Sequence, residues 1–257
     1  MGETQEIGPP KPKYEFTNEW FLGNFAGKGI EVDVVSIWRA LFERYPISTV
    51  LEIGSYEGRS TVFIAETIAT KNDLDIYCVD TWRGSFEHPG HDFERIEARF
   101  DNNISAVTKL FPSSLKIHKL KMTSIEACTA LINEQREFDL VYIDGSHNAS
   151  DVLADAVLSF FLLKPGGLMI FDDYLWTYGF QVSGNILNIP KLGIDAFVNC
   201  FQDKLKIIQG FPSYQLYCEK ILTPSVPSSA QSHNTDTSLI RSLRRAVGSA
   251  ARAVHLK

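Results

Sequence analysis

Three acidic residues follow two apolar stretches of the sequence. Asp144 lies near the end of FDLVYIDG (138–145), and Asp172 and Asp173 end LMIFDD (168–173). Adjacent carboxylates repel each other, and removing them from water is costly unless something pairs with them. If the two stretches are neighbouring strands, the three carboxylates meet at one sheet edge, and such hard oxygen ligands suit Mg²⁺, Ca²⁺ or Mn²⁺. The structural alternative is that Asp172 caps a turn and Asp173 pairs with a basic residue.

A second candidate site is the stretch VLEIGSYEGRST, in which Gly54 and Gly58 follow an apolar run. A glycine turn after a strand lets the backbone approach a ligand, and the start of the next helix offers free N–H groups. Asp80 ends the next apolar run, 22 residues after Gly58, where a carboxylate can accept hydrogen bonds from both ribose hydroxyls. The residues alone therefore predict a ribose-bearing ligand. Taken by itself, the glycine motif also fits a strand-to-helix turn without a ligand.

The elements that must position these residues alternate between strands and helices. Strands are expected at residues 48–54, 74–80, 114–121, 138–145 and 168–173, and a hairpin at 206–220. Helices are expected at residues 34–45, 59–69, 92–110, 124–135, 149–163 and 190–205. This alternation predicts an α/β fold: a Rossmann-like, doubly wound, seven-stranded sheet that is mostly parallel, with an antiparallel C-terminal hairpin strand. Ligands of such sheets bind beyond the carboxyl ends of the strands.

The composition narrows the class of protein. The 257 residues carry a net charge of −6, with 44% apolar and 22% charged residues, which is ordinary for a soluble globular protein and disfavours a nucleic-acid partner. No apolar run reaches the length of a membrane span, and the N-terminus has no signal-peptide pattern. The four cysteines form no CxxC pair, so we expect reduced thiols in a cytoplasmic protein.

The ordered motifs LEIGSYEG, CVDTW, FDLVYIDGSH and LLKPGGLMIFDDY resemble a class I S-adenosylmethionine-dependent methyltransferase. More narrowly, they resemble the O-methyltransferase group that includes the macrocin and aminocoumarin-sugar enzymes. YEFTNEWF, near the N-terminus, is similar to the start of many bacterial members. The resemblance covers roughly residues 14 to 220 and implies S-adenosyl-L-methionine as the cofactor.

The resemblance also implies roles for single residues. Glu52 and Gly54 would face the methionine part of the cofactor, Gly58 and Ser60 the turn behind it, Asp80 the ribose, and Met122, Thr123 and Ser124 the adenine. Ser55 and Thr81 would also bind the cofactor, and Asp144 would have a cofactor-binding, a metal-binding and a catalytic role. In the resembling sugar enzymes, the positions of Asp144, Asp172 and Asp173 hold a divalent ion such as Mg²⁺, which grips two hydroxyls of the acceptor. The loop at residues 82–91 would cover the cofactor.

One departure from the family pattern concerns the catalytic base. The closest pattern reads IDGD, whereas this chain reads IDGSH, with Ser146 in place of the acid and His147 after it. If that acid is the usual base, His147 could replace it, because an imidazole pKa near ~6.5 suits removal of a hydroxyl proton. The alternative is that His147 is a polar residue that binds a helix cap or the cofactor carboxylate.

The resemblance and the composition together divide the chain into five parts. These are a disordered N-terminus (1–13), a helical cap segment (14–46), the methyltransferase domain (47–221), a polar linker (222–238) and a basic amphipathic tail (239–257). The tail has apolar residues at helical spacing, five Lys or Arg and no acid, which is typical of a peripheral membrane or partner contact. A solvated or disordered tail is the alternative.

Three functions follow from these observations. The first is O-methylation of a sugar or another small hydroxylated acceptor, assisted by a divalent cation. The second is metal-free N- or O-methylation that uses His147. The third is a methyltransferase-like domain that binds without turnover, against which the acids kept at the strand ends argue. The sequence names neither the acceptor nor the oligomeric state, and an oligomer is compatible with it.

Overall fold

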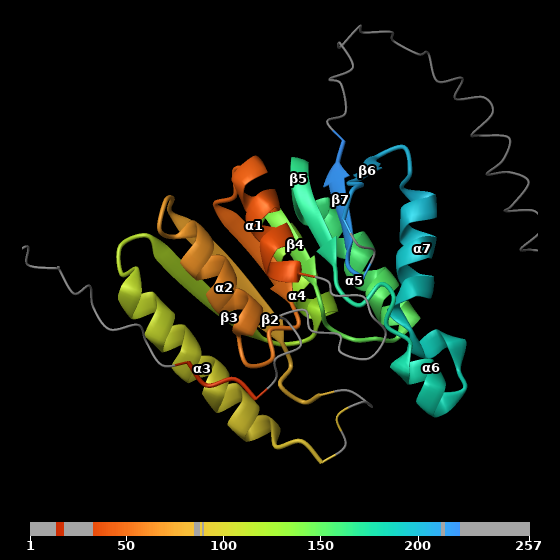
Figure 1. The fold of residues 1–257 in the computed structure, drawn as a ribbon, viewed down its shortest axis with the longest axis horizontal. Coiled ribbons are helices and arrows are strands. Elements are labelled where there is room, and N and C mark those ends of the chain that lie inside the picture. Colours follow the sequence, from red (N-terminus) through yellow and green to blue (C-terminus); the bar gives the residue numbers. More distant parts are fainter. Residues whose placement is uncertain (1–13, 18–32, 85–87, 89, 212–213, 222–257) are drawn as a thin grey trace, which may run out of the picture. The chain divides into compact units, whose positions relative to one another are not determined.

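Seven strands form one mixed sheet in the order β3-β2-β1-β4-β5-β7-β6 (Figure 1). The structure is a computed structural model, and it describes residues 14–17, 33–84, 88, 90–211 and 214–221. The strands are β1 (Thr49–Ile53), β2 (Leu74–Asp80), β3 (Leu115–Lys121), β4 (Phe138–Ile143), β5 (Leu163–Phe171), β6 (Leu205–Ile207) and β7 (Leu216–Lys220). Six strands run parallel, and β7 runs antiparallel to both of its neighbours. The predicted fold class is therefore confirmed.

Helices cover both faces of this sheet (Figure 1). They are α1 (Val34–Arg44), α2 (Arg59–Ile68), α3 (Phe93–Leu110), α4 (Ser124–Asn133), α5 (Ala149–Leu162), α6 (Tyr178–Ser183) and α7 (Pro190–Cys200), with a 3₁₀ turn, η2 (Ile186–Asn188). One apolar core lies between the sheet and α1, α2 and α3, and a second lies between the sheet and α4, α5 and α7. Strand residues alternate between the two cores; Leu140 and Tyr142 of β4 face the first, and Val141 and Ile143 the second.

The register of the strands brings the predicted site residues into one row. Ile53 pairs with Val79 on one side and with Ile143 on the other, and Ile143 pairs with Phe171. The residues that follow these positions therefore lie side by side at the carboxyl edge, and they are Gly54, Asp80, Asp144 and Asp172. The strand order reverses between β1 and β4, which is where sheets of this kind bind ligands.

The structure differs from the sequence-based boundaries in two places. β5 begins at Leu163 and runs through the KPGG segment, which we had expected to be a turn between helix and strand. α6 and η2 were not predicted, because the segment between Asp173 and Pro190 has no clear 3.6-residue apolar period. The first difference lies at the start of β5, and the second lies in the segment that follows Asp172 and Asp173 at its end.

Several sequence-based expectations fall outside the described residues. The predictions of a disordered N-terminus, a linker and a basic tail concern residues that lie there entirely, and of the predicted cap segment only residues 14–17 and 33–46 are described. Within the described part, no helix is both long and apolar enough to cross a bilayer. Cys78, Cys128 and Cys218 are buried and unpaired, and Cys200 is exposed and unpaired.

Candidate functional site

A cavity of about 730 Å³ opens at the carboxyl edge of the sheet. Most of the residues predicted to form the site line it: Gly54, Ser55, Ser60, Asp80, Thr81, Met122, Thr123, Ser124, Asp144, His147 and Asp173. They come from the ends of five strands and from the starts of helices that follow, so the fold brings distant parts of the chain to one place. Glu52, Gly58 and Asp172 are not among the lining residues.

The turn after β1 is pressed against the end of β4. Gly54 has φ +88°, and a Cβ atom built there would lie 1.9 Å from the carbonyl oxygen of Asp144. The Gly54 N–H donates to Val79 O at 2.8 Å, and the Asp144 N–H donates to Ile53 O at 2.8 Å. Only glycine combines this backbone conformation with this close approach. The turn of the first motif and the acid of the second therefore share one rigid junction.

Asp80 ties this turn to the end of β2. One carboxylate oxygen accepts hydrogen bonds from the backbone N–H groups of Ser55 (3.1 Å) and Tyr56 (2.8 Å), and the other accepts from Trp82 N–H at 2.7 Å. The carboxylate also lines the cavity, so its remaining lone pairs face the space that a ligand would fill. Asp80 both shapes the turn and offers an acceptor to a ligand hydroxyl.

Glu52 and Gly58 support the turn from behind. The Glu52 carboxyl is fully buried and accepts hydrogen bonds from the hydroxyls of Ser55, Ser60 and Thr61 at 2.5–2.7 Å. Burial raises its pKa, and the three hydroxyls act in the opposite direction. Gly58 adopts a left-handed conformation at the N-cap of α2, with Phe100 packed against it. The sequence motif therefore contains residues that build the turn as well as residues that face the cavity.

The opposite end of the cavity lies at the start of α4. Thr123 caps this helix: its hydroxyl accepts from the Glu126 N–H, and the Glu126 carboxylate accepts from the Thr123 N–H at 3.0 Å. Asp155 of α5 lies beside this end and is 2% exposed. One of its oxygens has no hydrogen-bond partner among the described residues. Burial raises the pKa of this carboxyl from 3.8 to about 6.

The raised pKa of Asp155 makes the stability of the protein depend on pH. Folding is favoured by the protonated form, so this contribution is fully present below about pH 4 and is lost as the pH rises through about 6. We expect Asp155→Asn to match the parent near pH 4 and to be more stable by ~1–3 kcal/mol above pH 7. Urea denaturation at both pH values measures this difference. Asp73→Asn, at an exposed position outside α5, is the control; a pH-independent effect of Asp155→Asn would contradict the prediction.

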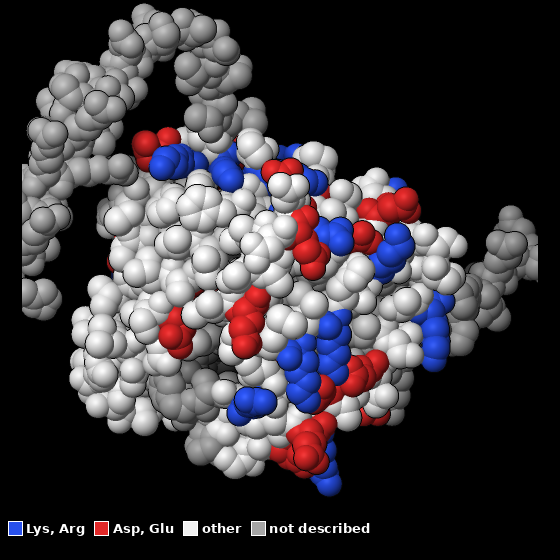
Figure 2. All heavy atoms as spheres, turned by 180° about the vertical axis from the view of Figure 1, so that it is seen from behind, with Lys and Arg blue, Asp and Glu red and all other residues white. Residues whose placement is uncertain are grey.

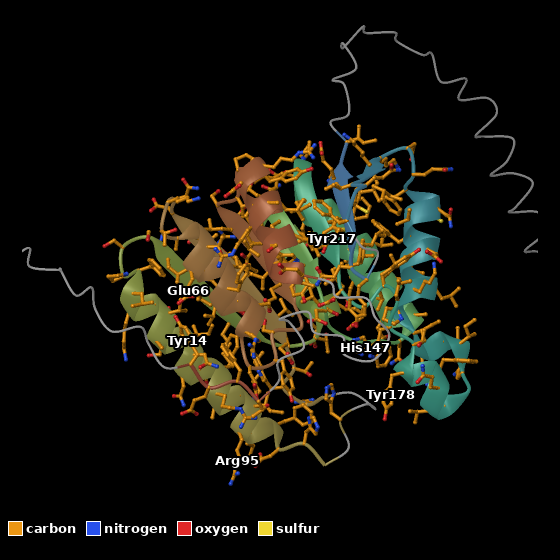
Figure 3. All side chains as sticks on the ribbon, in the orientation of Figure 1. Tyr14, Glu66, Arg95, His147, Tyr178 and Tyr217 are labelled. Atoms are coloured by element: carbon orange, nitrogen blue, oxygen red, sulfur yellow. The ribbon has the colours of Figure 1, made fainter. Side chains whose placement is uncertain are left out.

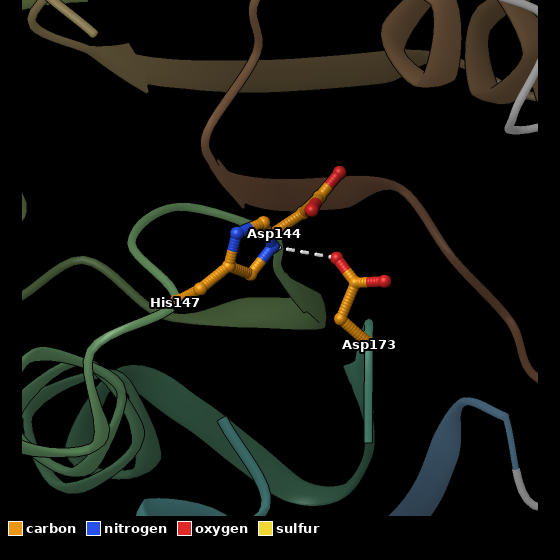
Figure 4. Close-up of side chains that lie close together, drawn as sticks. All are labelled: Asp144, His147 and Asp173. Carbon is orange, nitrogen blue, oxygen red and sulfur yellow. Dashed lines mark hydrogen bonds and ion pairs between the residues drawn. The ribbon is translucent and has the colours of Figure 1, made fainter. Parts of the chain in front are cut away.

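Asp144, His147 and Asp173 converge on one side of the cavity (Figure 4). One ligand-type atom from each lies within 4.8 Å of the others, and His147 Nε2 lies 2.6 Å from an oxygen of Asp173. The other Asp173 oxygen accepts from the Tyr214 hydroxyl at 2.5 Å. Asp173 reaches this position because its backbone is left-handed, with φ +56°, a conformation that aspartate tolerates better than most residues.

Asp172 does not join this group, in contrast to the metal set predicted from the sequence. It continues the direction of β5, so its carboxyl stays in the sheet and is 4% exposed. It accepts hydrogen bonds from the Tyr142 hydroxyl, from the Gln215 amide at 3.0 Å and from the Asp173 N–H at 2.8 Å. The Gln215 side chain in turn accepts from the Trp38 indole at 2.8 Å, so Asp172 connects the site to α1.

The electrostatics of the acidic cluster favour a positive partner. Burial and the charges of Asp172 and Asp173 raise the pKa of the Asp144 carboxyl well above its ordinary value. Burial and the charge of Asp173 raise the pKa of Asp172 to about 7. The single Tyr142 hydroxyl lies between Asp144, at 3.0 Å, and Asp172, and it has only one proton to donate. Two carboxylates and an imidazole at this spacing fit a divalent cation, whose charge would relieve this repulsion.

A short N-terminal segment is fastened beside the cavity, and sequence reasoning missed the residues that hold it. Glu57, which is buried and lines the cavity, accepts from the Thr17 N–H and hydroxyl at 2.7 Å and pairs with Arg99 at 2.6 Å. The Tyr14 hydroxyl donates to Glu66 of α2 at 2.8 Å (Figure 3). The signal in the sequence was present, since Glu57 lies inside the glycine motif, but its partner residues are distant along the chain.

Aromatic side chains form the walls of the cavity. Trp176 lines it and stacks on His147, with ring centroids 4.3 Å apart, and Tyr56 stacks on His88 at 5.8 Å. Trp82 also touches the cavity, but its ring is buried on Phe100 and its indole N–H donates to Tyr56 O at 2.8 Å. Of the two tryptophans beside strand ends, Trp176 is the one available to a ligand.

Comparison with known proteins gives an independent view of this site. Residues 51–174 match a family model described as a methyltransferase domain, a span that runs from β1 to just beyond Asp173. The O-methyltransferase TomG from Streptomyces achromogenes, solved with S-adenosylmethionine (SAM), has a similar fold at 13% identity and a TM-score of 0.51, covering 73% of this chain and 79% of that one. A Bacillus cereus O-methyltransferase, solved with S-adenosylhomocysteine (SAH), is similar at 17% identity and a TM-score of 0.51, covering 73% and 80%.

No curated protein sequence matches the chain, so the family match and the fold carry the assignment. The family match covers the turns and strand ends from β1 to β5 that line the cavity. The predicted enzyme class is confirmed, whereas the macrocin-like subgroup stays a prediction. Residues 51–174 are similar to a methyltransferase domain, and together with the fold this match supports S-adenosylmethionine-dependent methylation.

Proposed function

We propose that the chain transfers a methyl group from SAM to a hydroxyl of a small, sugar-like acceptor, with a divalent cation at Asp144, His147 and Asp173. The observation that carries this proposal is the convergence of those three side chains within 4.8 Å at the wall of the cavity. Two carboxylates and an imidazole suit Mg²⁺ or Mn²⁺ more than a thiolate-seeking metal. The two solved neighbours are O-methyltransferases, which supports a hydroxyl acceptor.

In this proposal, the residues of the cavity divide between cofactor and acceptor. Gly54, Ser55 and Ser60 contact the methionine part, Asp80 and Thr81 the ribose, and residues 122–124 the adenine. Glu52 and Gly58 act indirectly, by holding the turn. Asp172 acts through its hydrogen bonds to Tyr142 and to the Asp173 N–H, which orient the acidic cluster.

The chemistry follows from these positions. SAM, when bound, supplies an electrophilic methyl group, which the acceptor oxygen takes while sulfur keeps the bonding pair; a methyl ether, SAH and a proton result. A divalent cation held by the cluster would lower the pKa of the acceptor hydroxyl and orient it. Trp176 and Tyr214 enclose the acceptor side and exclude water.

A second candidate is a metal-free reaction, and the short contact between His147 and Asp173 favours it. An imidazole whose Nε2 lies 2.6 Å from a carboxylate is held in one orientation, and its protonated form is stabilised. In this version His147 accepts the hydroxyl proton directly. The acceptor is then free to be an amine or a hydroxyl, because no cation selects for oxygen.

Calorimetry and an acceptor screen distinguish these versions. We expect SAH to bind EDTA-treated protein, and Mg²⁺ to bind the SAH-loaded protein in a second step. A panel of hydroxylated acceptors, read by a mass increase of one methyl group, identifies a substrate. EDTA should then lower its turnover by about tenfold or more, with recovery on adding Mg²⁺. Turnover that EDTA leaves unchanged would favour the His147 version, and failure to bind SAH would contradict both.

A further inference from the structure

The segment between the acidic cluster and α7 exposes an unusual amount of apolar surface. Twelve large hydrophobic side chains are exposed in the described part of the chain, and seven of them lie between residues 175 and 192. Residues 174–190 contain no Asp, Glu, Lys or Arg. The α6 region, at the lower right of Figure 1, is correspondingly free of red and blue at the lower left of Figure 2, which views the molecule from behind. We call residues 175–192 the apolar face.

The apolar face is an ordered platform. Its polar side chains are used within it: Asn188 donates to the Ser183 hydroxyl at 2.9 Å, and the Asn185 carboxamide accepts from Leu187 N–H at 3.0 Å. A Cβ at Gly179 would lie 2.0 Å from Asn188 O, so α6 and η2 are in direct backbone contact. These polar side chains bond within the segment, and the apolar face exposes Phe180, Val182 and Ile186 to solvent, by 47%, 64% and 57%. Exposed apolar patches of this kind mark interaction surfaces.

The apolar face is continuous with the mouth of the cavity. Trp176 lines the cavity and stacks on His147, while its neighbours Leu175 and Tyr178 are exposed. Figure 3 shows Tyr178 close to His147 on this side of the molecule. A small acceptor at the cavity would cover the residues next to Trp176 but not those of η2, because the seven side chains are spread over α6, η2 and the start of α7. The partner must therefore be larger than the acceptor.

We propose that the apolar face docks on the surface of an anionic lipid bilayer, with the cavity mouth beside the head groups. Tyr and Trp at the rim of an apolar patch suit the membrane interface, where one part of the ring is apolar and the other is wet. The chain carries −6 overall, so an anionic surface would repel it unless a cationic segment took part. Residues 239–257 supply five Lys or Arg and no acid, and they lie outside the described residues.

Vesicle sedimentation of the full chain tests the proposal. We expect the protein to sediment with vesicles of phosphatidylcholine and phosphatidylglycerol, and Phe180→Ser with Ile186→Ser to reduce the partition coefficient by about tenfold or more. The matched control is Phe161→Ser with Ile207→Ser, which removes one exposed phenylalanine and one exposed isoleucine elsewhere and should sediment like the parent. High salt should weaken binding of the parent, because it screens the basic tail.

Each other outcome counts against the proposal. Equal sedimentation of the apolar-face variant and its control, or no sedimentation of the parent, would overturn it. If the parent does not sediment with vesicles but forms dimers in light scattering, and the apolar-face variant is monomeric, the apolar face is a self-association surface instead. Circular dichroism checks folding; if the double variant unfolds, the single changes Val182→Ser and Ile186→Ser give the same comparison. SAH binding is measured separately, so that a failure of membrane binding can be distinguished from a failure of the proposed methyl transfer.

Discussion

Gly54→Ala is expected to abolish measurable SAH binding and to lower the stability of the protein by ~3–5 kcal/mol. The new Cβ would lie 1.9 Å from the Asp144 carbonyl oxygen and 2.4 Å from its carbon, and both are backbone atoms that cannot rotate away. The turn after β1 would have to move out, and Ser55 and Tyr56 would then lose their hydrogen bonds to Asp80. Thermal unfolding should show a decrease in Tm of roughly 10 °C, and calorimetry should show no SAH binding.

Gly210→Ala separates the two causes of this effect. Gly210 has φ +99°, so alanine there is also strained, but among the described residues no atom outside its chain neighbours lies within 4 Å of the added Cβ. We expect a loss of only ~1 kcal/mol and normal SAH binding. If both variants lost similar stability, backbone conformation alone would explain the result, and the junction between the turn and Asp144 would not matter.

Asp144→Asn is expected to reduce turnover by about 10²–10³-fold while changing SAH affinity by less than about threefold. The substitution keeps the shape of the side chain and leaves the backbone hydrogen bond to Ile53 intact, so the turn should hold. It removes the negative charge from the cluster with His147 and Asp173. Electron paramagnetic resonance with Mn²⁺ should show loss of a bound ion, and turnover is measured on an acceptor from the screen.

Two further variants control for charge and for position. Asp151→Asn removes an acid that lines the same cavity but lies outside the cluster, and it should leave Mn²⁺ binding and turnover unchanged. Asp172→Asn compares the metal set expected from the sequence with the one seen in the structure. Because the Asp172 carboxyl bonds to Tyr142 and Gln215, we expect Mn²⁺ binding to weaken less than in Asp144→Asn. If Asp172→Asn and Asp144→Asn weakened Mn²⁺ binding equally, Asp172 would also be a metal ligand.

The fold and the position of the cavity could be predicted because they depend on local patterns. Apolar runs of strand length alternate with amphipathic helices, and the polar residues that end the runs reach the edge because the strands are parallel. Asp80 and Asp144 were therefore assigned to one edge from the sequence alone. The prediction that β4 and β5 are neighbours is also confirmed.

The details of the acidic cluster could not be predicted, because they depend on a single backbone conformation. Asp172 and Asp173 are equivalent in the sequence, and only the left-handed φ of Asp173 turns one of them into the cavity and leaves the other in the sheet. Tyr142 and Gln215, which hold Asp172, come from positions 30 and 43 residues away from it. Glu57 was missed for the same reason, since its partners Thr17 and Arg99 are distant in sequence.

The contact between Gly54 and the backbone of Asp144 has a consequence for redesign. It fixes the turn after β1, which we propose holds the cofactor, to the end of β4 through main-chain atoms. The distance between them therefore does not depend on which side chains surround the acceptor. The segment from Leu175 to Leu192 lies on the other side of Asp173 and takes no part in that contact. A library at Trp176, the residue of this segment that lines the cavity, is therefore expected to change which molecules are methylated while the geometry of transfer is inherited unchanged.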